Sequence, residues 1–289
     1  MSRIAYVNGR YVPHSDAAVH VEDRGYQFAD GVYEVIAVRG GAAVDLGLHL
    51  DRLSRSLAAL SIAEPMSRRA LAHILRQVVV RNRVRDGIVY LQITRGVAPR
   101  NHPFPRHVRP SVVVTARPGV GPRAAQVEEG GRVVSVPDAR WARRDVKSVS
   151  LLPNVLAKQA AVEKGAYEAW LTMPDGTVTE ASASNAWIVT ADGTLVTHPL
   201  GHDILPGVTR KVVLDLARAA GMTVAERAFT LDEAKAAREA FITSTTAFVL
   251  AVTQIDDTVV GNGHPGEVAR ALRALYQDRM AGAAAWTVP

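Results

Sequence analysis

Apolar and polar residues alternate along the first part of the chain, at the spacing of half-buried strands. The alternation flanks Asn8-Gly9, a pair that is the strongest short-range signal for a β-hairpin. It returns at Val32–Val38, which leads into the pair Gly40-Gly41. We therefore expect two β-hairpins at the start of the fold.

The spacing then changes from that of strands to that of helices. Leu53, Leu57 and Leu60 share one face of a helix, and Ser67 is a residue type suited to cap the start of the next one. The elements expected here are helices over about 46–60 and 67–82 and strands over 87–94 and 111–116. Because strands and helices are segregated along the chain, the order favours an α+β fold over a doubly wound sheet.

A stretch near the middle of the chain has the composition of a linker between domains. Residues 117–123 read Arg-Pro-Gly-Val-Gly-Pro-Arg, rich in turn formers and without periodicity. We place an N-terminal α/β domain at 1–118, the linker at 119–124 and a C-terminal domain at 125–289. The elements expected in the C-terminal domain are a strand over 132–136, a helix over about 154–164, hairpins that turn at 174–176 and 191–193, and helices from about 209, 230 and 265.

Composition and charge narrow the functional classes. The 289 residues include no cysteine, which excludes disulfides, thiolate metal sites and a cysteine nucleophile and agrees with a reducing compartment. The N-terminus reads as a strand and turn rather than a signal peptide, and charged, Gly or Pro residues interrupt every apolar stretch before about 18 residues. The net charge of +6 arises from scattered arginines, which suit small anionic ligands as well as nucleic acid. We expect a cytoplasmic protein that binds neither membrane nor nucleic acid and holds no metal.

Chemistry that needs an amine nucleophile has five candidate residues, since the chain contains five lysines. Three of them lie in charged or helix-ending contexts typical of solvent-facing residues, namely Lys164, Lys211 and Lys235. Lys158 is ambiguous. Lys147 lies in the strand-like, apolar stretch Asp145–Leu152, which would desolvate its amine. A strand lysine that simply points to solvent remains the alternative.

Two stretches could bind a phosphate group. Leu205–Thr209 is a Gly-containing turn that delivers a threonine into a helix start, and Thr243–Thr246 follows an apolar strand. Together with Arg52 they could close around one phosphate. Ordinary hydroxyl caps and a solvent-facing arginine are the alternatives at this stage.

Two further groups carry candidate chemistry. Glu180 precedes a run of small residues, which would let a ring or backbone approach closely, although the same run would form an ordinary turn. Arg100 and His102 follow a strand end and Tyr33 lies on another strand, so the three could converge on a carboxylate. A basic loop is the alternative, since Arg106 and two more basic residues follow closely.

Together these stretches resemble the D-amino-acid transaminase family of pyridoxal-phosphate enzymes, which have fold type IV. The resemblance spans nearly the whole chain. The motifs that carry it are Glu22–Glu34, His49–Leu53, Thr94–His102, Asp145–Ser148, Leu156–Gln159, Thr179–Asn185 and Phe241–Thr246. It implies a homodimer of two-domain chains, each with a small α/β N-terminal domain and a larger, barrel-like C-terminal α/β domain, and pyridoxal 5'-phosphate bound between them.

The resemblance also implies roles for individual residues. Lys147 matches the lysine that forms the Schiff base and carries the proton between Cα and the cofactor C4′, and Glu180 matches the partner of the pyridine nitrogen. Further cofactor contacts are implied for Arg52, Ser184, Leu205, Val208, Thr209, Ser244 and Thr245. Substrate contacts are implied for Tyr33, Val35, Arg100, His102 and Thr246; among them Tyr33, Arg100 and His102 match the family's carboxylate trap, and His102 reaches the neighbouring subunit's site.

The trap distinguishes this chain from other enzymes that share the fold. Branched-chain and (R)-amine transaminases resemble it at Lys147 and Glu180 but lack the Pro-Arg-x-His arrangement of Pro99–His102, and aminodeoxychorismate lyases do not need a trap for a small α-carboxylate. The implied reaction takes the amino group of a D-alanine-type donor to a 2-oxo acid such as 2-oxoglutarate and yields pyruvate and D-glutamate. Those relatives remain alternatives, as does a basic non-enzymatic module that binds anionic polymers.

Two positions depart from the family pattern. Ala29 stands where the family commonly has glycine, and Ala183 replaces a usual serine after Glu180. Both changes are small, so we expect them to affect side-chain tolerance and cofactor affinity rather than the class of reaction.

Overall fold

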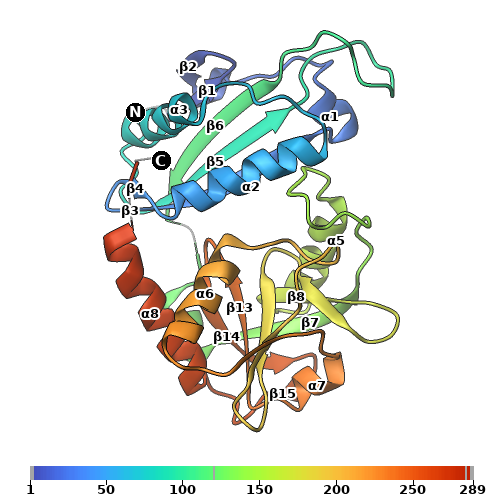
Figure 1. Ribbon diagram of the computed structural model, residues 1–289, viewed down its shortest axis with the longest axis vertical. Helices are drawn as coiled ribbons and strands as arrows, with labels where there is room; N and C mark the ends of the chain where they lie inside the picture. The colour runs from blue at the N-terminus through green and yellow to red at the C-terminus, as the bar shows by residue number, and fades with distance from the viewer. Residues whose placement is uncertain (1–2, 120, 284, 287–289) are drawn as a thin grey trace. The chain divides into compact units, whose positions relative to one another are not determined.

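The computed structural model describes residues 3–119, 121–283 and 285–286 (Figure 1). It divides into two compact units. The first contains the described residues up to 119, residues 146–150 and the described residues from 280 onward; the second contains 121–145 and 151–279. The first break lies within the stretch 119–124, whereas the short segment with Lys147 groups with the first unit. In the described ranges, no helix has the length and apolar character needed to cross a membrane.

The first unit is built on a six-stranded antiparallel sheet in the order β2-β1-β6-β5-β3-β4. Its strands are β1 (Ile4–Val7), β2 (Arg10–Pro13), β3 (Gly31–Arg39), β4 (Ala42–Ala43), β5 (Gly87–Thr94) and β6 (Ser111–Pro118). Both predicted hairpins are confirmed: Asn8 and Gly9 have φ of 44° and 95°, and Gly40 and Gly41 have φ of 57° and 83°. Positive φ at both turn residues is the conformation that suits two-residue hairpins.

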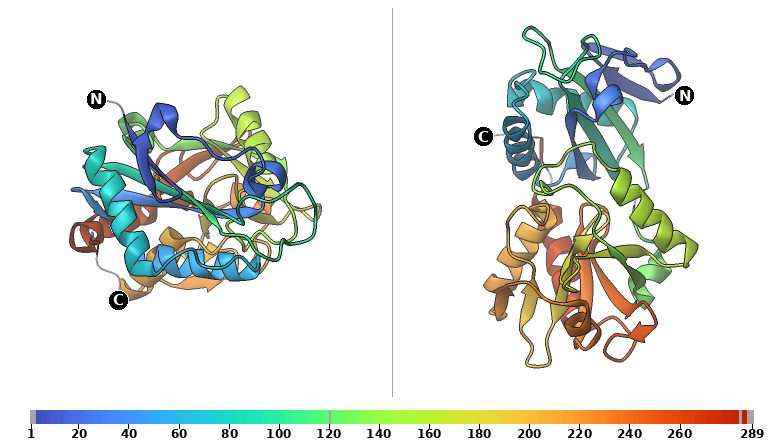
Figure 2. Two further views of the ribbon diagram at one scale, coloured as in Figure 1. Left: turned by 90° about the horizontal axis from the view of Figure 1, so that it is seen from above. Right: turned by 90° about the vertical axis from the view of Figure 1, so that its right-hand side faces the viewer.

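Helices cover one face of this sheet (Figures 1 and 2). They are α2 (Leu46–Ala59) and α3 (Arg68–Arg81). Two shorter helices of this unit, η1 (His14–Asp16) and α1 (Arg24–Phe28), contribute no residue to the core between helices and sheet. The leucines expected at helical spacing in α2, Leu53 and Leu57, are buried against the sheet with Ile36 and Leu91. Ser67 caps α3 by accepting a hydrogen bond from the Ala70 N–H at 3.3 Å, as predicted.

The second unit contains a nine-stranded mixed sheet that curls into a half-barrel (Figure 1). Its order is β12-β11-β10-β13-β14-β7-β8-β9, with β15 paired to β14. The strands are β7 (Gly131–Pro137), β8 (Glu168–Thr172), β9 (Val178–Ala181), β10 (Asn185–Val189), β11 (Leu195–Thr197), β12 (Val224–Glu226), β13 (Glu239–Ser244), β14 (Phe248–Ile255) and β15 (Thr258–Val259). The helices are α4 (Ala124–Glu129), α5 (Leu152–Glu163), α6 (Val208–Ala219), α7 (Leu231–Lys235) and α8 (Glu267–Ala283). The α+β class is therefore confirmed.

The stretch around Lys147 was expected to be strand-like, and that prediction is wrong. Only Ser148 forms a bridge, to Val32 of β3. The Ser148 N–H bonds back to the Val146 carbonyl at 2.8 Å, and the Lys147 N–H bonds to the Ser56 hydroxyl at 3.2 Å. Because these bonds turn the chain at Lys147, the pairing cannot extend into a strand.

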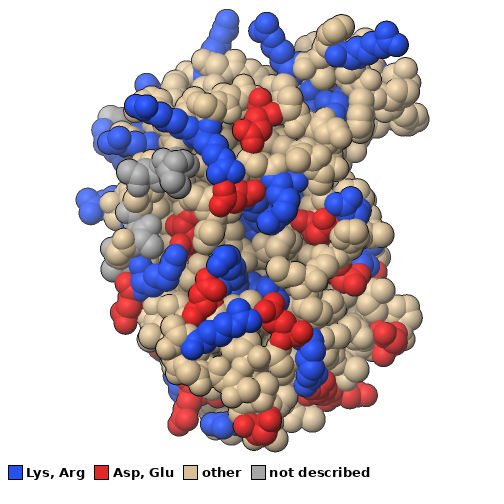
Figure 3. Space-filling view, viewed as in Figure 1, with Lys and Arg blue, Asp and Glu red and all other residues tan. Residues whose placement is uncertain are grey.

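Charged side chains of both signs are interspersed over most of the face in Figure 3, and basic side chains predominate toward its top. A mixed pattern of this kind differs from the continuous basic stripe that tracks a nucleic-acid backbone.

The end of α1 carries local backbone strain. Ala29, its C-terminal cap, has φ 55° and ψ 28°, in the left-handed region. A residue with a Cβ atom is destabilised by about 1–2 kcal/mol in this conformation, which is why glycine is usual there. The departure from the family pattern at Ala29 therefore has a cost in stability.

Replacing Ala29 with glycine should raise the free energy of unfolding by about 1 kcal/mol, because it removes this strain. Urea unfolding would measure the change. Ala58→Gly is the matched control: Ala58 is exposed within α2, so the same replacement should lower stability by roughly 0.5–1 kcal/mol. Destabilisation by both changes would contradict the strain argument.

Candidate active site

The predicted site residues fall into two groups, one in each unit. The first unit carries Tyr33, Val35, Arg52, Arg100, His102 and Lys147. The second carries Glu180, Ser184, Leu205, Val208, Thr209, Ser244, Thr245 and Thr246.

The alternation of β3 places Tyr33 and Val35 on the face of the first sheet opposite the one that packs on α2 and α3. Val32, Glu34 and Ile36, between and beside them, are fully buried. The Tyr33 ring stacks on that of Tyr90 of β5, with centroids 5.7 Å apart. This face therefore presents an aromatic pair.

Tyr90 is held in its neutral form on that face. Burial, with a smaller contribution from Tyr33, raises the pKa of Tyr90 to about 12. Its hydroxyl donates to Gln92 Oε1 at 2.7 Å. The phenol is thus a neutral hydrogen-bonding group throughout the physiological pH range.

Lys147 lies at the aromatic pair. Its Nζ is 4.2 Å from the centroid of the Tyr33 ring, a cation–π distance. The backbone is anchored on both sides, since Tyr33 N–H bonds to the Lys147 carbonyl and Val149 N–H to the Gly31 carbonyl, both at 3.0 Å. Lys147 is therefore half-buried, and its side chain lies against the Tyr33 ring instead of pointing into solvent.

The other lysines are in different surroundings. Lys158 contacts the Tyr167 carbonyl and lies 3.6 Å from Glu168, while Lys211 and Lys235 form ion pairs at 2.7 and 2.9 Å with Asp215 and Asp256 respectively. Lys164 is exposed. These four are paired with carboxylates or exposed, whereas Lys147 lies half-buried against an aromatic ring, and it is therefore the candidate amine among the five.

Arg52 is buried, so the solvent-facing alternative for it is wrong. Its Nε and Nη2 donate to the two oxygens of Glu34 at 2.8 and 2.7 Å, and His49 Nδ1 lies 2.8 Å from the same carboxylate. Burial alone would raise the pKa of Glu34, but the charge and hydrogen bonds of Arg52 and His49 bring it down to about 2. Burial also lowers the pKa of His49. A carboxylate thus fixes one edge of the Arg52 guanidinium.

Arg100 and His102 lie on an exposed loop after β5. The Arg100 guanidinium carbon is 4.6 Å from the centroid of the Phe28 ring, and the His102 ring is 5.5 Å from the same ring. The structure therefore brings these two predicted trap residues together on one aromatic side chain.

In the second unit, Glu180 is buried and surrounded by donors. It accepts hydrogen bonds from the Leu205 N–H at 3.1 Å and from Asn185 Nδ2 at 2.9 Å, and Arg140 Nη1 contacts it as well. Arg140 is held from its other side by Asp138, at 2.8–2.9 Å. Burial alone would lower the pKa of Arg140, but the two carboxylates, Glu180 and Asp138, raise it. Glu180 is thus a firmly positioned acceptor.

The start of α6 has the features of an anion site. The helix begins at Val208 and Thr209, and its N-cap residue, Gly207, provides no side-chain cap. The first N–H groups of a helix can bind an anion. Gly207 precedes them, and a Cβ there would lie 2.1 Å from Asn185 Oδ1. Asn185 Nδ2 also donates to the Leu205 carbonyl at 3.0 Å. One amide therefore couples Glu180 to the loop before α6.

The turn between β13 and β14 carries the remaining hydroxyls. Ser244 Oγ accepts the Ala247 N–H at 3.1 Å and lies 3.4 Å from Thr246 Oγ1. Thr243, one residue earlier, is paired with Asn185 in the sheet. Ser184 Oγ lies 3.5 Å from the carboxylate of Glu168. The turn thus begins beside Asn185, the residue that also donates a hydrogen bond to Glu180.

Sequence reasoning missed four residues of these clusters: Glu34, His49, Arg140 and Asn185. A signal existed for Glu34, because a carboxylate at a core-facing position of an alternating strand requires a buried partner. His49 lies three residues before Arg52, on the same face of α2. Arg140 had no such signal, since it comes from an irregular segment forty residues before Glu180.

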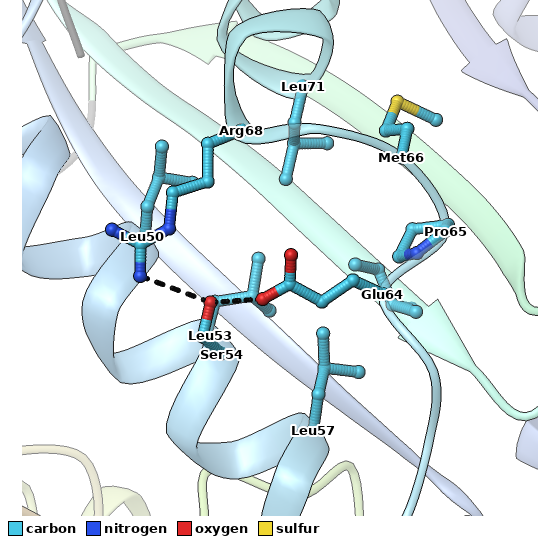
Figure 4. Close-up of a pocket in the computed structure, with 10 residues that line it drawn as sticks. Leu50, Leu53, Ser54, Leu57, Glu64, Pro65, Met66, Arg68 and Leu71 are labelled. Carbon is cyan, nitrogen blue, oxygen red and sulfur yellow. Dashed lines mark hydrogen bonds between the residues drawn. The ribbon is translucent and has the colours of Figure 1, made fainter. Parts of the chain in front are cut away.

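A small pocket in the first unit, between α2 and the segment that leads into α3, includes none of the predicted residues (Figure 4). Leu53, Leu57 and Leu71 are among its lining residues. Ser54 bridges Glu64 and Arg68 along its side, with a 3.2 Å hydrogen bond from Arg68. These polar groups satisfy one another, so we interpret the pocket as a packing feature.

Comparison with known proteins identifies relatives for this arrangement. The family described as amino-transferase class IV matches residues 31–255. The chain is 42% identical to a D-alanine aminotransferase of Bacillus licheniformis over 281 residues, which cover 97% of this chain and 98% of the relative. A D-alanine aminotransferase of Listeria innocua is 42% identical over 276 residues, 95% of each chain.

Solved structures of branched-chain aminotransferases are similar over nearly their whole length. That of the thermophilic archaeon Thermoproteus uzoniensis has a TM-score of 0.87 and 27% identity, and the match covers 98% of this chain and 96% of that one. Another, determined with pyridoxamine 5'-phosphate, has a TM-score of 0.88 and 27% identity over 98% of this chain and 95% of that one. The predicted fold type is thus confirmed.

Glu34→Gln should lower the free energy of unfolding by about 3 kcal/mol near neutral pH, because it leaves the buried Arg52 charge without its counter-ion. The pKa of Glu34 falls from 4.5 to about 2 on folding, so its stabilisation is complete above pH 4.5 and is lost as the pH falls toward 2. Urea unfolding should therefore show that the difference in free energy of unfolding between wild type and variant becomes smaller as the pH falls from 4.5 toward 2.

Asp86→Asn is the control for this measurement, because it removes one carboxylate from an exposed pair with Arg39, 3.7 Å apart. It should change stability by less than about 1 kcal/mol. A similar loss in both variants would show that burial of the pair is not what matters.

Proposed function

Because the chain belongs to the class IV aminotransferases, we propose that it moves the amino group of a D-amino acid to a 2-oxo acid, with D-alanine and 2-oxoglutarate as a representative pair. Pyruvate and D-glutamate are then the products. The observation that carries this choice of donor is the grouping of Arg100 and His102 on Phe28, in the same unit as Lys147 and Tyr33. The identity to D-alanine aminotransferases supports the same choice.

Class IV aminotransferases use pyridoxal 5'-phosphate, and the residues of this chain fit that group. The start of α6 suits a phosphate, and the buried Glu180 suits a protonated ring nitrogen. The proposed cofactor contacts are Arg52, Lys147, Glu180, Ser184, Leu205, Val208, Thr209, Ser244 and Thr245. When bound, the cofactor supplies an electron sink for the electron pair left at the substrate Cα.

Lys147 is the proposed catalytic residue. Its amine would hold the cofactor when that group is bound, and it would serve as the base that takes the proton from the substrate Cα. Two backbone hydrogen bonds anchor residues 147–149 to β3, and so fix the point from which the Lys147 side chain extends. Proximity of this kind contributes much of the rate in general base catalysis.

Tyr33, Arg100 and His102 are the proposed carboxylate-binding residues. A guanidinium binds a carboxylate through two parallel hydrogen bonds, which fixes its orientation as well as its position. Val35, on the same face of β3 as Tyr33, and Thr246 are the proposed contacts of the substrate side chain. A donor that lacks the α-carboxylate would lose this orientation.

We also propose that the protein works as a cytoplasmic homodimer. The exposed face of α5 includes Leu152, Val155 and Leu156, which are 68%, 58% and 62% exposed. An apolar cluster of this size on a helix surface favours burial in a second copy. The lack of cysteine agrees with a reducing compartment.

A panel of amino donors tests the proposed reaction. With pyridoxal 5'-phosphate bound, D-alanine should change the visible absorption of the protein in a half-reaction, and 2-oxoglutarate should reverse the change; L-alanine should do neither. Lys147→Ala should abolish the absorption band of the bound form and slow turnover by at least about 10²–10⁴-fold, while exposed Lys164→Ala should change neither. Equal reaction of L-alanine, or a normal band in Lys147→Ala, would refute the proposal.

Arg100→Ala should raise the KM for D-alanine by about 10–100-fold, the effect of losing a hydrogen bond to a charged group. The concentration dependence of the half-reaction with (R)-1-phenylethylamine, which has no carboxylate, should change little. Arg106→Ala, in the same exposed loop, is the matched control. If Arg100→Ala weakens both donors equally, the carboxylate assignment is wrong.

A further inference from the structure

The segment Glu22–Asp30 holds the start of the loop that carries Arg100 and His102. Backbone hydrogen bonds join the two: Arg24 N–H donates to the Gly96 carbonyl at 2.9 Å, and Ala98 N–H to the Glu22 carbonyl at 3.2 Å. In Figures 1 and 2, α1 lies beside this loop in both orientations. The loop is thus anchored at its base, although its tip is exposed.

One side chain extends the anchorage to the trap residues themselves. Arg24 is buried, and its Nη1 donates to the Asn101 carbonyl at 2.6 Å and its Nη2 to the His102 carbonyl at 3.2 Å. Its Nε donates to Asp30 at 2.8 Å. The planar fork of a guanidinium therefore meets three acceptors at once, two of them on the backbone beside Arg100.

Asp30 ties this arrangement to the rest of the first unit. It also accepts from Arg95 at 2.7 and 3.0 Å, and Arg95 donates in turn to the carbonyls of Leu60 and Ser61 at 2.7 and 2.9 Å. Burial alone would raise the pKa of Asp30, but the hydrogen bonds and charges of Arg95 and Arg24 lower it. The carboxylate thus keeps its charge between two cations.

The Phe28 ring contacts the side chains of both Arg100 and His102. The guanidinium carbons of Arg24 and Arg100 lie 4.9 and 4.6 Å from its ring centroid, and the His102 ring lies 5.5 Å away at an angle of 45°. An arginine on an exposed loop would otherwise sample many rotamers. Contact with the ring reduces that freedom before any substrate binds.

The short helix α1, which carries both Arg24 and Phe28, is itself fixed in place. Asp23 accepts the Gly25 N–H at 2.8 Å and the Thr94 hydroxyl at 3.0 Å. A Cβ at Gly25 would lie 2.2 Å from Thr94 Cγ2, so α1 packs directly against the end of β5.

We propose that Arg24 is a positioning residue for the carboxylate trap: it fixes the backbone at Asn101 and His102 so that Arg100 and His102 meet the substrate carboxylate on the Phe28 platform. The inference deepens the proposed function and rests on it. Lysine cannot replace Arg24, because a single ammonium cannot reach three acceptors that lie around a planar fork.

Arg24→Lys should raise the KM for D-alanine about tenfold, since a small misplacement of a binding group is enough for such a loss. The limiting rate of the half-reaction, and the half-reaction with (R)-1-phenylethylamine, should change little. In an Arg100→Ala background, Arg24→Lys should raise the KM for D-alanine by much less than tenfold, because most of its effect passes through Arg100. Arg76→Lys, at an exposed position of α3, is the matched control.

Hydrogen exchange of the cofactor-free protein provides a readout that does not depend on activity. Arg24→Lys should speed exchange over residues 96–104 and leave β3 and the rest of β5 unchanged. Should Arg24→Lys fail to fold, Phe28→Leu serves instead: it keeps the hydrogen bonds of Arg24 but removes the platform, and should raise the KM for D-alanine severalfold without faster exchange.

The outcomes separate the two ideas. If Arg100→Ala raises the KM for D-alanine but Arg24→Lys and Phe28→Leu do not, the positioning role is wrong and the proposed function stands. The positioning role would also be wrong if Arg24→Lys weakened the reactions of D-alanine and (R)-1-phenylethylamine equally. It would be wrong as well if the effects of Arg24→Lys and Arg100→Ala on the KM for D-alanine were additive in the double variant. If wild-type protein shows no reaction with D-amino acids, the proposed function fails even when the exchange experiment shows that Arg24 holds the loop.

Discussion

Taking a guanidinium group out of water costs several kcal/mol unless a carboxylate meets it, and this requirement organises both units. In the first unit Glu34 receives Arg52, and Asp30 receives Arg24 and Arg95. In the second, Asp138 and Glu180 share Arg140. Each pair fixes a planar group in one orientation, and two of the candidate site residues, Arg52 and Glu180, are held in this way.

The ion pairs also bear on how the chain uses its two kinds of cationic residue, arginine and lysine. All but five of its 34 basic residues are arginines, and those met by buried carboxylates lose their freedom to move. Arginine keeps its charge in such surroundings, whereas a buried lysine tends to lose its proton. A chain that relies on arginine for binding can therefore reserve a lysine for chemistry that needs a reactive amine.

Local patterns predicted much of the fold and part of the site. The hairpins at Asn8-Gly9 and Gly40-Gly41 and the helix capped by Ser67 could be predicted because each depends on neighbours in the sequence. The turn at Lys147 could not, since the bonds that stop a strand there come partly from Ser56, ninety-one residues away. The surroundings of Arg52 were missed for the same reason: its partner is on β3, and helical spacing alone shows only a polar position. Arg140 contacts Glu180 across forty residues, with no spacing rule to connect them.

The position of Arg100 over the Phe28 ring has a consequence for how an arginine on an exposed loop can remain available to a ligand. A guanidinium has two kinds of surface: flat faces, which are weakly hydrated and favour aromatic rings, and an edge of N–H groups, which favours anions. A ring that occupies a face does not compete with an anion at the edge. Phe28 can therefore keep the Arg100 side chain ordered and still leave its N–H edge available to an anion, whereas a carboxylate in the same place would occupy that edge.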